Sequence, residues 1–209
     1  VFKERSAVVK WLRERCRAGA HLRIDSRDVV AGDVFVALKG SKTDGIKFVP
    51  VAAARGARAV LTEERSEALA PSAVEILSVK NLPQYLGQIA SDFYENPSES
   101  LYGIGVTGTN GKTSISHWCA ALLTHLAMPC AAVGTIGTFF SGASFKAPAL
   151  TTPDAVSTQG LLYDLKAAGA KAFAIEASSI GLVQGRLSGV AFKTAVFTNL
   201  TRDHLDYHN

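Results

Sequence analysis

The spacing of hydrophobic residues along the first part of the chain predicts a small domain that mixes helices and strands. Apolar residues recur at helical spacing between positions 7 and 17, with basic residues between them, which indicates an amphipathic helix. An alanine-rich stretch at 48–55 predicts a second helix, and a third is expected to begin near Pro83. Four short runs rich in apolar residues are predicted to be strands: 22–25, 33–38, 57–61 and 74–79.

After residue 98 the apolar runs become longer and nearly continuous. Strands are predicted at 101–107, 130–135, 171–176 and 191–199, with a Gly/Ser/Phe-rich hairpin or loop after the second of them. Helices are predicted at 112–126 and 154–168. Continuous apolar strands are typical of sheets that are covered by helices on both faces, so this part is expected to form a parallel, doubly wound sheet.

The polar, proline-containing segment 95–100 separates the two patterns. We therefore predict an α/β protein with two domains, 1–98 and 99–209. The chain begins without methionine and ends in the polar run RDHLDYHN, so we expect a piece of a longer protein whose second domain is truncated.

Composition narrows the class of protein but does not identify its partner. With 47% hydrophobic residues among 209, the chain can bury a core, and no apolar stretch approaches the length of a membrane span. The net charge of +4 suits a small polyanion as well as a nucleic acid. Cys16, Cys119 and Cys130 form no CxxC pair, which favours a reducing, cytoplasmic compartment and a structural role for all three.

The clearest chemical signal is VTGTNGKTS at 106–114, where a predicted strand meets a predicted helix. Glycines in such a loop turn the backbone so that its amides point at phosphate oxygens, while Lys112 reaches the outer phosphates and Thr113 can bind magnesium. Val106 stands where the strict GxxxxGK[ST] pattern has its first glycine, which points to a subset of phosphate-loop proteins. The predicted nucleotide-binding residues are Gly108, Thr109, Asn110, Gly111, Lys112, Thr113 and Ser114.

A magnesium-nucleotide site also needs a carboxylate, and Glu176 ends the apolar run KAFAIE. An acidic residue at the carboxyl end of a parallel strand faces the ligand crevice, although a strand-end glutamate can also simply meet solvent. In the final run, His204 and His208 are four apart, but no third zinc ligand is evident, so we predict that His204 supports the metal or phosphates. The predicted metal-binding residues are Thr113, Glu176 and His204, and the predicted catalytic residues are Lys112, Glu176 and His204.

Six motifs together resemble the Mur ligases. They are TGTNGKT, TTPD, EASS, VQGR and TNLTRDHLDYH, behind an N-terminal DSRDVVAGDVFVALKG. The resemblance implies an N-terminal UDP-binding domain followed by a central ATPase domain, with a C-terminal amino-acid-binding domain missing here. It also implies an ATP- and magnesium-dependent ligase that adds the third amino acid, diaminopimelate or lysine, to UDP-N-acetylmuramoyl-L-alanyl-D-glutamate through an acyl phosphate. This stretch alone is then expected to bind substrate and nucleotide but not to ligate.

The resemblance also assigns substrate-binding residues motif by motif. They are Ile24, Ser26, Ser41, Lys42 and Thr43 for the uridine end, and Thr151, Thr152, Ser178, Gln184 and Arg186 for the muramoyl dipeptide. Each could instead be a helix cap or a turn residue. Many relatives have a histidine after the paired serines, but this chain has Ile180 there.

Three other readings remain open on the sequence alone. A different Mur ligase or a folylpolyglutamate synthetase would share the phosphate loop, although DSRDVVAGDVFVAL and TTPD weigh against folate. A UDP-sugar- or nucleotide-binding module without catalysis is also consistent. A nucleic-acid-binding ATPase is disfavoured, because the basic residues are dispersed and no aromatic stacking platform is visible.

Overall fold

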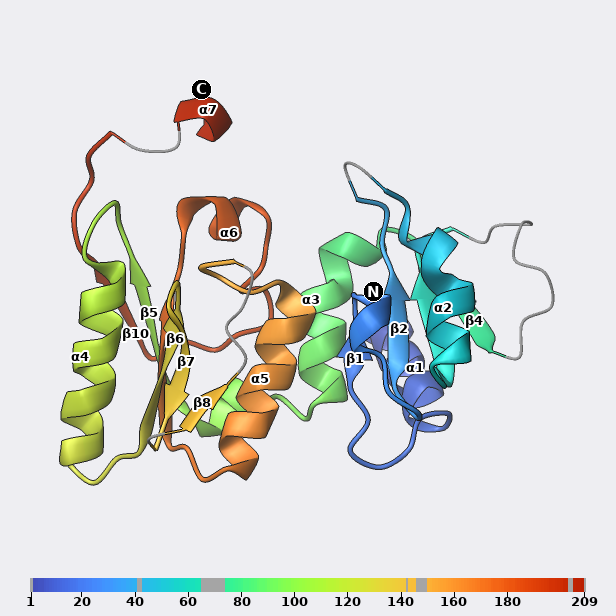
Figure 1. The fold of residues 1–209 in the computed structure, drawn as a ribbon, viewed down its shortest axis with the longest axis horizontal. Helices are drawn as coiled ribbons and strands as arrows, with labels where there is room; N and C mark the ends of the chain where they lie inside the picture. The colour runs from blue at the N-terminus through green and yellow to red at the C-terminus, as the bar shows by residue number, and fades with distance from the viewer. Residues whose placement is uncertain are drawn as a thin grey trace. The chain divides into compact units, whose positions relative to one another are not determined.

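The computed structural model describes residues 2–40, 43–64, 74–141, 143–145, 150–202 and 205–208. The chain forms two compact units, Val1–Phe93 and Tyr94–Asn209 (Figure 1). The border that the sequence suggests near residue 98 falls within the 3-10 helix η3 (Pro97–Ser100) of the second unit.

The first unit contains a four-stranded parallel sheet in the order β1-β2-β3-β4. Its strands are β1 (Leu22–Arg23), β2 (Val34–Ala37), β3 (Ala59–Thr62) and β4 (Glu75–Ser78). Its helices are α1 (Phe2–Arg13), η1 (Ser26–Asp28), η2 (Gly45–Phe48), α2 (Val49–Ala54) and α3 (Leu82–Phe93). The sequence placed the first helix at 7–17, whereas α1 ends at Arg13, which leaves Cys16 in the turn that follows.

Alternating residues of these strands pack on opposite faces of the sheet. Phe35 and Ile76 belong to the core cluster that also contains residues of α2. Leu77, the neighbour of Ile76, faces the other way and lines a cavity together with Val8 of α1 and Ile89 of α3. Helices therefore cover both faces, which explains why the central strands β2 and β3 are buried along their whole length.

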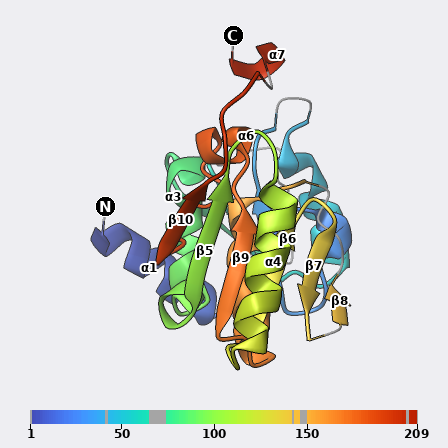
Figure 2. The ribbon, with the colours of Figure 1, turned by 90° about the vertical axis from the view of Figure 1, so that its left-hand side faces the viewer.

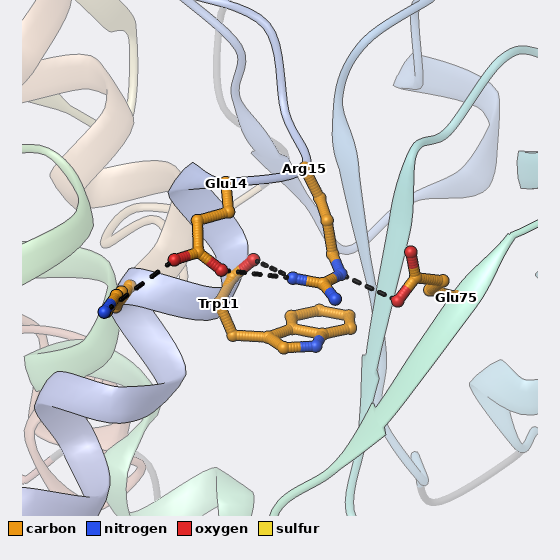
Figure 3. A network of polar contacts seen from close by, with 5 residues as sticks. Trp11, Glu14, Arg15 and Glu75 are labelled. Carbon is orange, nitrogen blue, oxygen red and sulfur yellow. Dashed lines mark hydrogen bonds and ion pairs between the residues drawn. The ribbon is translucent and has the colours of Figure 1, made fainter.

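The end of α1 is tied to the edge strand β4 by the side chain of Arg15 (Figure 3). Its guanidinium lies 4.3 Å from the centroid of the Trp11 ring and donates to the Trp11 carbonyl at 3.1 Å. Its Nε atom lies 2.8 Å from Oε2 of Glu75. Its Nη1 atom also lies 3.6 Å from Oε2 of Glu14, so one side chain makes a cation–π contact, a hydrogen bond and two ion pairs.

Arg15→Ala is expected to lower the free energy of unfolding by about 1–2 kcal/mol, because four modest interactions are lost together. Urea denaturation followed by circular dichroism measures this. Lys10→Ala is the matched control, since its ammonium lies 3.9 Å from Glu14 and its side chain is 79% exposed. If Arg15→Ala and Lys10→Ala lowered the free energy of unfolding equally, the Arg15 contacts would not contribute to stability as proposed.

The second unit contains a six-stranded sheet in the order β10-β5-β9-β6-β7-β8, which Figure 2 shows from β10 on the left to β8 on the right. Its strands are β5 (Tyr102–Thr107), β6 (Cys130–Gly134), β7 (Gly137–Phe140), β8 (Ala143–Phe145), β9 (Ala172–Glu176) and β10 (Thr194–Phe197). Its helices are α4 (Lys112–His125), α5 (Ala155–Ala167), α6 (Ser179–Val183) and α7 (Leu205–His208), besides η3. Four strands are parallel, and the hairpin of β7 and β8 adds an antiparallel edge.

Two helices on opposite faces bury this sheet, as the sequence predicted. The small residues Ala132 and Ala174 face α4, whereas Val133 and Ile175 face the larger cluster beside α5. Figure 1 shows α4 on one side of the strands and α5 on the other. The α/β fold class with parallel sheets is confirmed, but the second sheet is mixed rather than wholly parallel. In the part of the chain that the structure describes, no helix combines the length and the apolar character needed to cross a membrane.

Cys130 lies in the core beneath α4, where only 4% of its surface is exposed. Burial, with a smaller effect of nearby Cys119, raises the pKa of the Cys130 thiol to about 12. The thiol therefore stays protonated at pH 8, and the thiolate is the reactive form. Mass spectrometry after iodoacetamide treatment at pH 8 is expected to find Cys130 unmodified in the native protein and modified after denaturation. Rapid native labelling would contradict the buried placement.

Candidate functional site

The carboxyl ends of β10, β5, β9 and β6 meet at one edge of the second sheet, and polar residues follow each of them. Ligands of open parallel sheets bind outside this edge. Most of the residues that the sequence predicts for the second unit's site lie in the segments that leave these four strands.

The loop after β5 turns sharply at two glycines with left-handed backbones. Gly108 has φ +126° and Gly111 has φ +86°. A Cβ atom at Gly108 would overlap Oγ1 of Thr198 and crowd the backbone of Asn199, so the loop can pass here only without a side chain. Gly111 caps α4, whose first amides have no partner within the helix and point toward the loop. This arrangement suits an anion, because the helix also places its positive dipole end there.

The ammonium of Lys112 is folded back over the loop that precedes it. Its Nζ atom donates to the carbonyls of Gly108 at 2.7 Å and Thr109 at 2.9 Å. A positive charge thus sits at the centre of the loop. Thr113, the next residue of α4, is half-buried, and Ser114 is exposed.

The segment after β10 holds the same loop in place through hydrogen bonds from Thr198 and Asn199. Neither residue was among the predicted site residues. Asn199 accepts from the amides of Thr109 at 2.9 Å and Asn110 at 3.1 Å and donates to the Asn110 carbonyl at 3.0 Å. Thr198 donates to that carbonyl at 2.7 Å. The signal was present in TNLTRDH, whose polar residues directly follow a strand, but nothing in the sequence shows which loop they contact.

Glu176 ends β9 with only 1% of its surface exposed. Its Oε1 accepts from the backbone amide of Thr135 at 2.9 Å, and its Oε2 accepts from the Thr135 hydroxyl at 3.2 Å. Among the described residues, no cationic side chain pairs with this carboxylate. A buried carboxylate normally has a cationic partner or a metal ion, so Glu176 fits an oxygen ligand of magnesium.

The structure describes only one of the other two predicted metal ligands, Thr113 and His204. Thr113 is the second residue of α4, the helix that follows β5, and β5 is paired with β9, so a threonine hydroxyl in this position fits a second oxygen ligand. His204 lies outside the described residues. No group of three or more histidine, cysteine or acidic side chains that could hold a metal ion occurs in the ranges that the structure describes.

Thr152, Ser178 and Arg186 form one hydrogen-bonded group beside Glu176. The Thr152 hydroxyl donates to the Glu176 carbonyl at 2.7 Å and accepts from the Ser178 amide at 2.9 Å. The Ser178 hydroxyl caps α6 by accepting from Gly181 at 3.1 Å. Arg186 donates from Nη1 to the Thr152 carbonyl at 2.9 Å. The capping role and a ligand-binding role are thus compatible for these residues.

Gln184 extends this group toward the end of the chain. Its Oε1 accepts from Nε and Nη2 of Arg186 at 3.0 and 2.6 Å, and its Nε2 lies 3.3 Å from the hydroxyl of Tyr207. His208 lies 2.9 Å from the Ser179 hydroxyl, next to half-buried Ile180. Position 180 has no histidine in this chain, but the imidazole of His208 contacts Ser179, the residue directly before it.

The predicted uridine-binding residues of the first unit follow two neighbouring strands. Ile24 and Ser26 come after β1, and Thr43 comes after β2, which is parallel to β1. Ile24 is exposed and Ser26 is buried. Ser41 and Lys42 lie outside the described residues. The local turn is fixed by Asp25, whose side chain caps η1 by accepting from the Arg27 amide at 2.9 Å.

In this unit a strand leads through a glycine loop and a lysine into a helix, and the neighbouring strand ends in a buried acid. This arrangement is typical of nucleotide-binding proteins of the phosphate-loop class. Family models narrow this class: the Mur ligase middle domain matches residues 106–209, and the Mur ligase family catalytic domain matches residues 20–94. The chain belongs to the Mur ligase family.

Individual relatives share one name. The chain is 44% identical over 208 residues to the UDP-N-acetylmuramoyl-L-alanyl-D-glutamate--2,6-diaminopimelate ligase of Janthinobacterium sp., covering 97% of this chain and 41% of the relative. The identity is 49% over 188 residues to the ligase of that name from Pseudomonas aeruginosa, covering 90% and 38%. A solved structure of a ligase with this name matches with a TM-score of 0.72 at 36% identity, covering 90% and 38%. The chain thus spans about two fifths of the length of these relatives.

Proposed function

We propose that this chain is the part of a peptidoglycan ligase that holds the UDP-linked substrate and ATP. The complete enzyme would add diaminopimelate or lysine to UDP-N-acetylmuramoyl-L-alanyl-D-glutamate. The observation that carries the proposal is the group at one sheet edge: the lysine-containing loop, the buried Glu176 carboxylate and the Thr152–Arg186 pair. The relatives' name supports the choice of substrate, and the nucleotide-linked substrate together with the scattered cysteines supports a cytoplasmic location.

The chemistry requires two polyanions to approach each other. The substrate's D-glutamyl carboxylate attacks the terminal phosphorus of ATP and ADP leaves; the amine of the added amino acid then displaces phosphate, loses a proton and forms the amide. The protein supplies alignment and charge rather than a nucleophile. Lys112 would contact the outer phosphates of the nucleotide, and its ammonium would offset the charge that develops on them.

Magnesium, held by Thr113 and Glu176 with His204 nearby, would neutralise phosphate oxygens. Thr151, Thr152 and Ser178 would surround the acceptor carboxylate near Glu176, although the Thr152 hydroxyl itself is buried against the Glu176 carbonyl. Arg186 and Gln184 would hold the muramoyl dipeptide, and Ile24, Ser26 and the 41–43 segment the uridine. The amino acid to be added would be bound by sequence outside this chain.

Calorimetric titration of this chain with UDP-N-acetylmuramoyl-L-alanyl-D-glutamate tests the proposal, with free UDP and Mg-ATP as comparisons. The muramoyl dipeptide is expected to bind at least tenfold more tightly than UDP, because its peptide end would add contacts that UDP cannot make, such as those with Gln184 and Arg186. Equal affinities would contradict the assignment of the substrate. Binding of the dipeptide without any binding of Mg-ATP would instead contradict the assignment of the nucleotide loop.

A further inference from the structure

Thr135 contacts the carboxylate of Glu176 with both its backbone amide and its side chain. It follows the last residue of β6 and lies on the exposed surface, next to β9, whose last residue is Glu176. No motif includes it.

The two contacts act on different oxygens. The amide fixes Oε1 at 2.9 Å and the hydroxyl fixes Oε2 at 3.2 Å. A carboxylate gripped at both oxygens by one residue has little freedom to rotate about its terminal torsion, so its remaining lone pairs point in a set direction. Gly134 makes the grip possible, because a Cβ atom there would overlap the carboxylate of Glu176.

The same hydroxyl also reaches a residue predicted to bind substrate. Oγ1 of Thr135 lies 3.1 Å from Oγ1 of Thr151. An ionised carboxylate can only accept hydrogen bonds, and a threonine hydroxyl has one proton. The one proton of Thr135 can therefore go either to Glu176 or to Thr151, so the two residues compete for the same donor.

We propose that Thr135 is a positioning residue that aims the Glu176 carboxylate at the cation and links this carboxylate to Thr151. This inference rests on the proposed function, since it assumes that Glu176 holds the magnesium of a bound nucleotide. The backbone amide would keep the carboxylate in place, and the hydroxyl would set its orientation.

The test is the magnesium requirement of nucleotide binding. Thr135→Val keeps the shape and the backbone amide but removes the hydroxyl, so the magnesium concentration that gives half-maximal tightening of ATP binding is expected to rise five- to tenfold. ATP binding without magnesium should stay within twofold of wild type. Thr135→Ser, which restores the hydroxyl, should return the magnesium midpoint to the wild-type value.

Thr194→Val is the matched control, because it removes a threonine hydroxyl from β10 that lies 2.9 Å from the hydroxyl of Tyr102, away from Glu176. It should leave the magnesium midpoint unchanged. A magnesium midpoint for Thr135→Val within twofold of wild type would overturn the proposal. So would equal shifts for the valine and serine variants, since the effect would then come from shape and not from the hydroxyl.

A second measurement needs neither ATP nor magnesium. Thr135→Val should lower the urea midpoint of unfolding, because Oε2 of a buried carboxylate loses its donor, and this penalty should disappear in a Glu176→Ala background. A penalty of the same size in both backgrounds would show that Thr135 does not hold Glu176. If the wild-type chain bound no Mg-ATP, the proposed function would fail, while this cycle would still decide whether the contact exists.

Discussion

Replacing Lys112 with alanine is expected to weaken ATP binding to this chain at least 100-fold. The ammonium lies within 2.9 Å of two carbonyls of the loop and is the positive charge that the loop itself supplies. Its loss removes a cation from a site built for several negative charges, and it frees the carbonyls of Gly108 and Thr109 to turn toward the phosphates. A 100-fold change corresponds to about 2.7 kcal/mol, within the range for charge-assisted contacts to one group.

Titration with Mg-ATP measures this effect, and Lys166→Ala makes a control with the same change of net charge. Lys166 lies in the last turn of α5, which leads into the amino end of β9, at the opposite edge of the sheet. Lys112→Arg keeps the charge but replaces a compact ammonium with a planar fork, and it should recover only part of the affinity. Binding of Mg-ATP to Lys112→Ala within threefold of wild type would exclude the loop as the nucleotide site.

Local signals in the sequence were sufficient for most of the elements. Continuous apolar runs predicted β5, β6 and β9, because strands covered on both faces need apolar residues at every position. The Asp154 side chain that begins α5 accepts from two amides of its first turn, as a helix cap does. α6 was missed because it has only five residues and starts inside the EASS motif, where the sequence showed no helical periodicity.

Contacts between distant segments could not be predicted in the same way. The bonds between Glu176 and Thr135 join residues 41 apart, and those between Asn199 and Asn110 join residues 89 apart. These depend on the strand order β10-β5-β9-β6, which no local pattern encodes. The sequence could therefore propose Glu176 as a metal ligand from its place at a strand end, but it could not show which residues hold the carboxylate.

The order of the strands also explains why motifs far apart in the chain form one site. β5 leads into the glycine loop, its neighbour β9 ends in Glu176, and its other neighbour β10 ends at Phe197, two residues before Asn199. Parallel strands have their carboxyl ends at the same edge of the sheet, so a polar residue at or just after the end of each strand is enough to assemble the group. The apolar runs that predicted the strands therefore also predicted where the candidate site lies, at the carboxyl ends of these strands.

Replacing Arg186 with alanine is expected to raise the dissociation constant of UDP-N-acetylmuramoyl-L-alanyl-D-glutamate at least tenfold. Three of the five guanidinium N–H groups are used, one on the Thr152 carbonyl and two on Oε1 of Gln184. Two remain for a carboxylate or phosphate of the substrate. The substitution therefore removes a direct contact and also releases the residues that Arg186 holds in place.

The affinities for Mg-ATP and for free UDP separate a specific effect from a general loss of structure. Both should stay within twofold of wild type in Arg186→Ala, because the phosphate loop and the first unit do not depend on the bonds that Arg186 makes. Gln184→Ala tests whether Gln184 orients Arg186. If it does, this variant should also bind UDP-N-acetylmuramoyl-L-alanyl-D-glutamate more weakly than wild type, by less than Arg186→Ala. Arg58→Ala, an exposed arginine of the first unit, should change nothing. An unchanged dissociation constant in Arg186→Ala would restrict this arginine to bracing the Thr152 turn, and the substrate's negative groups would then have to be met by other donors at the same sheet edge.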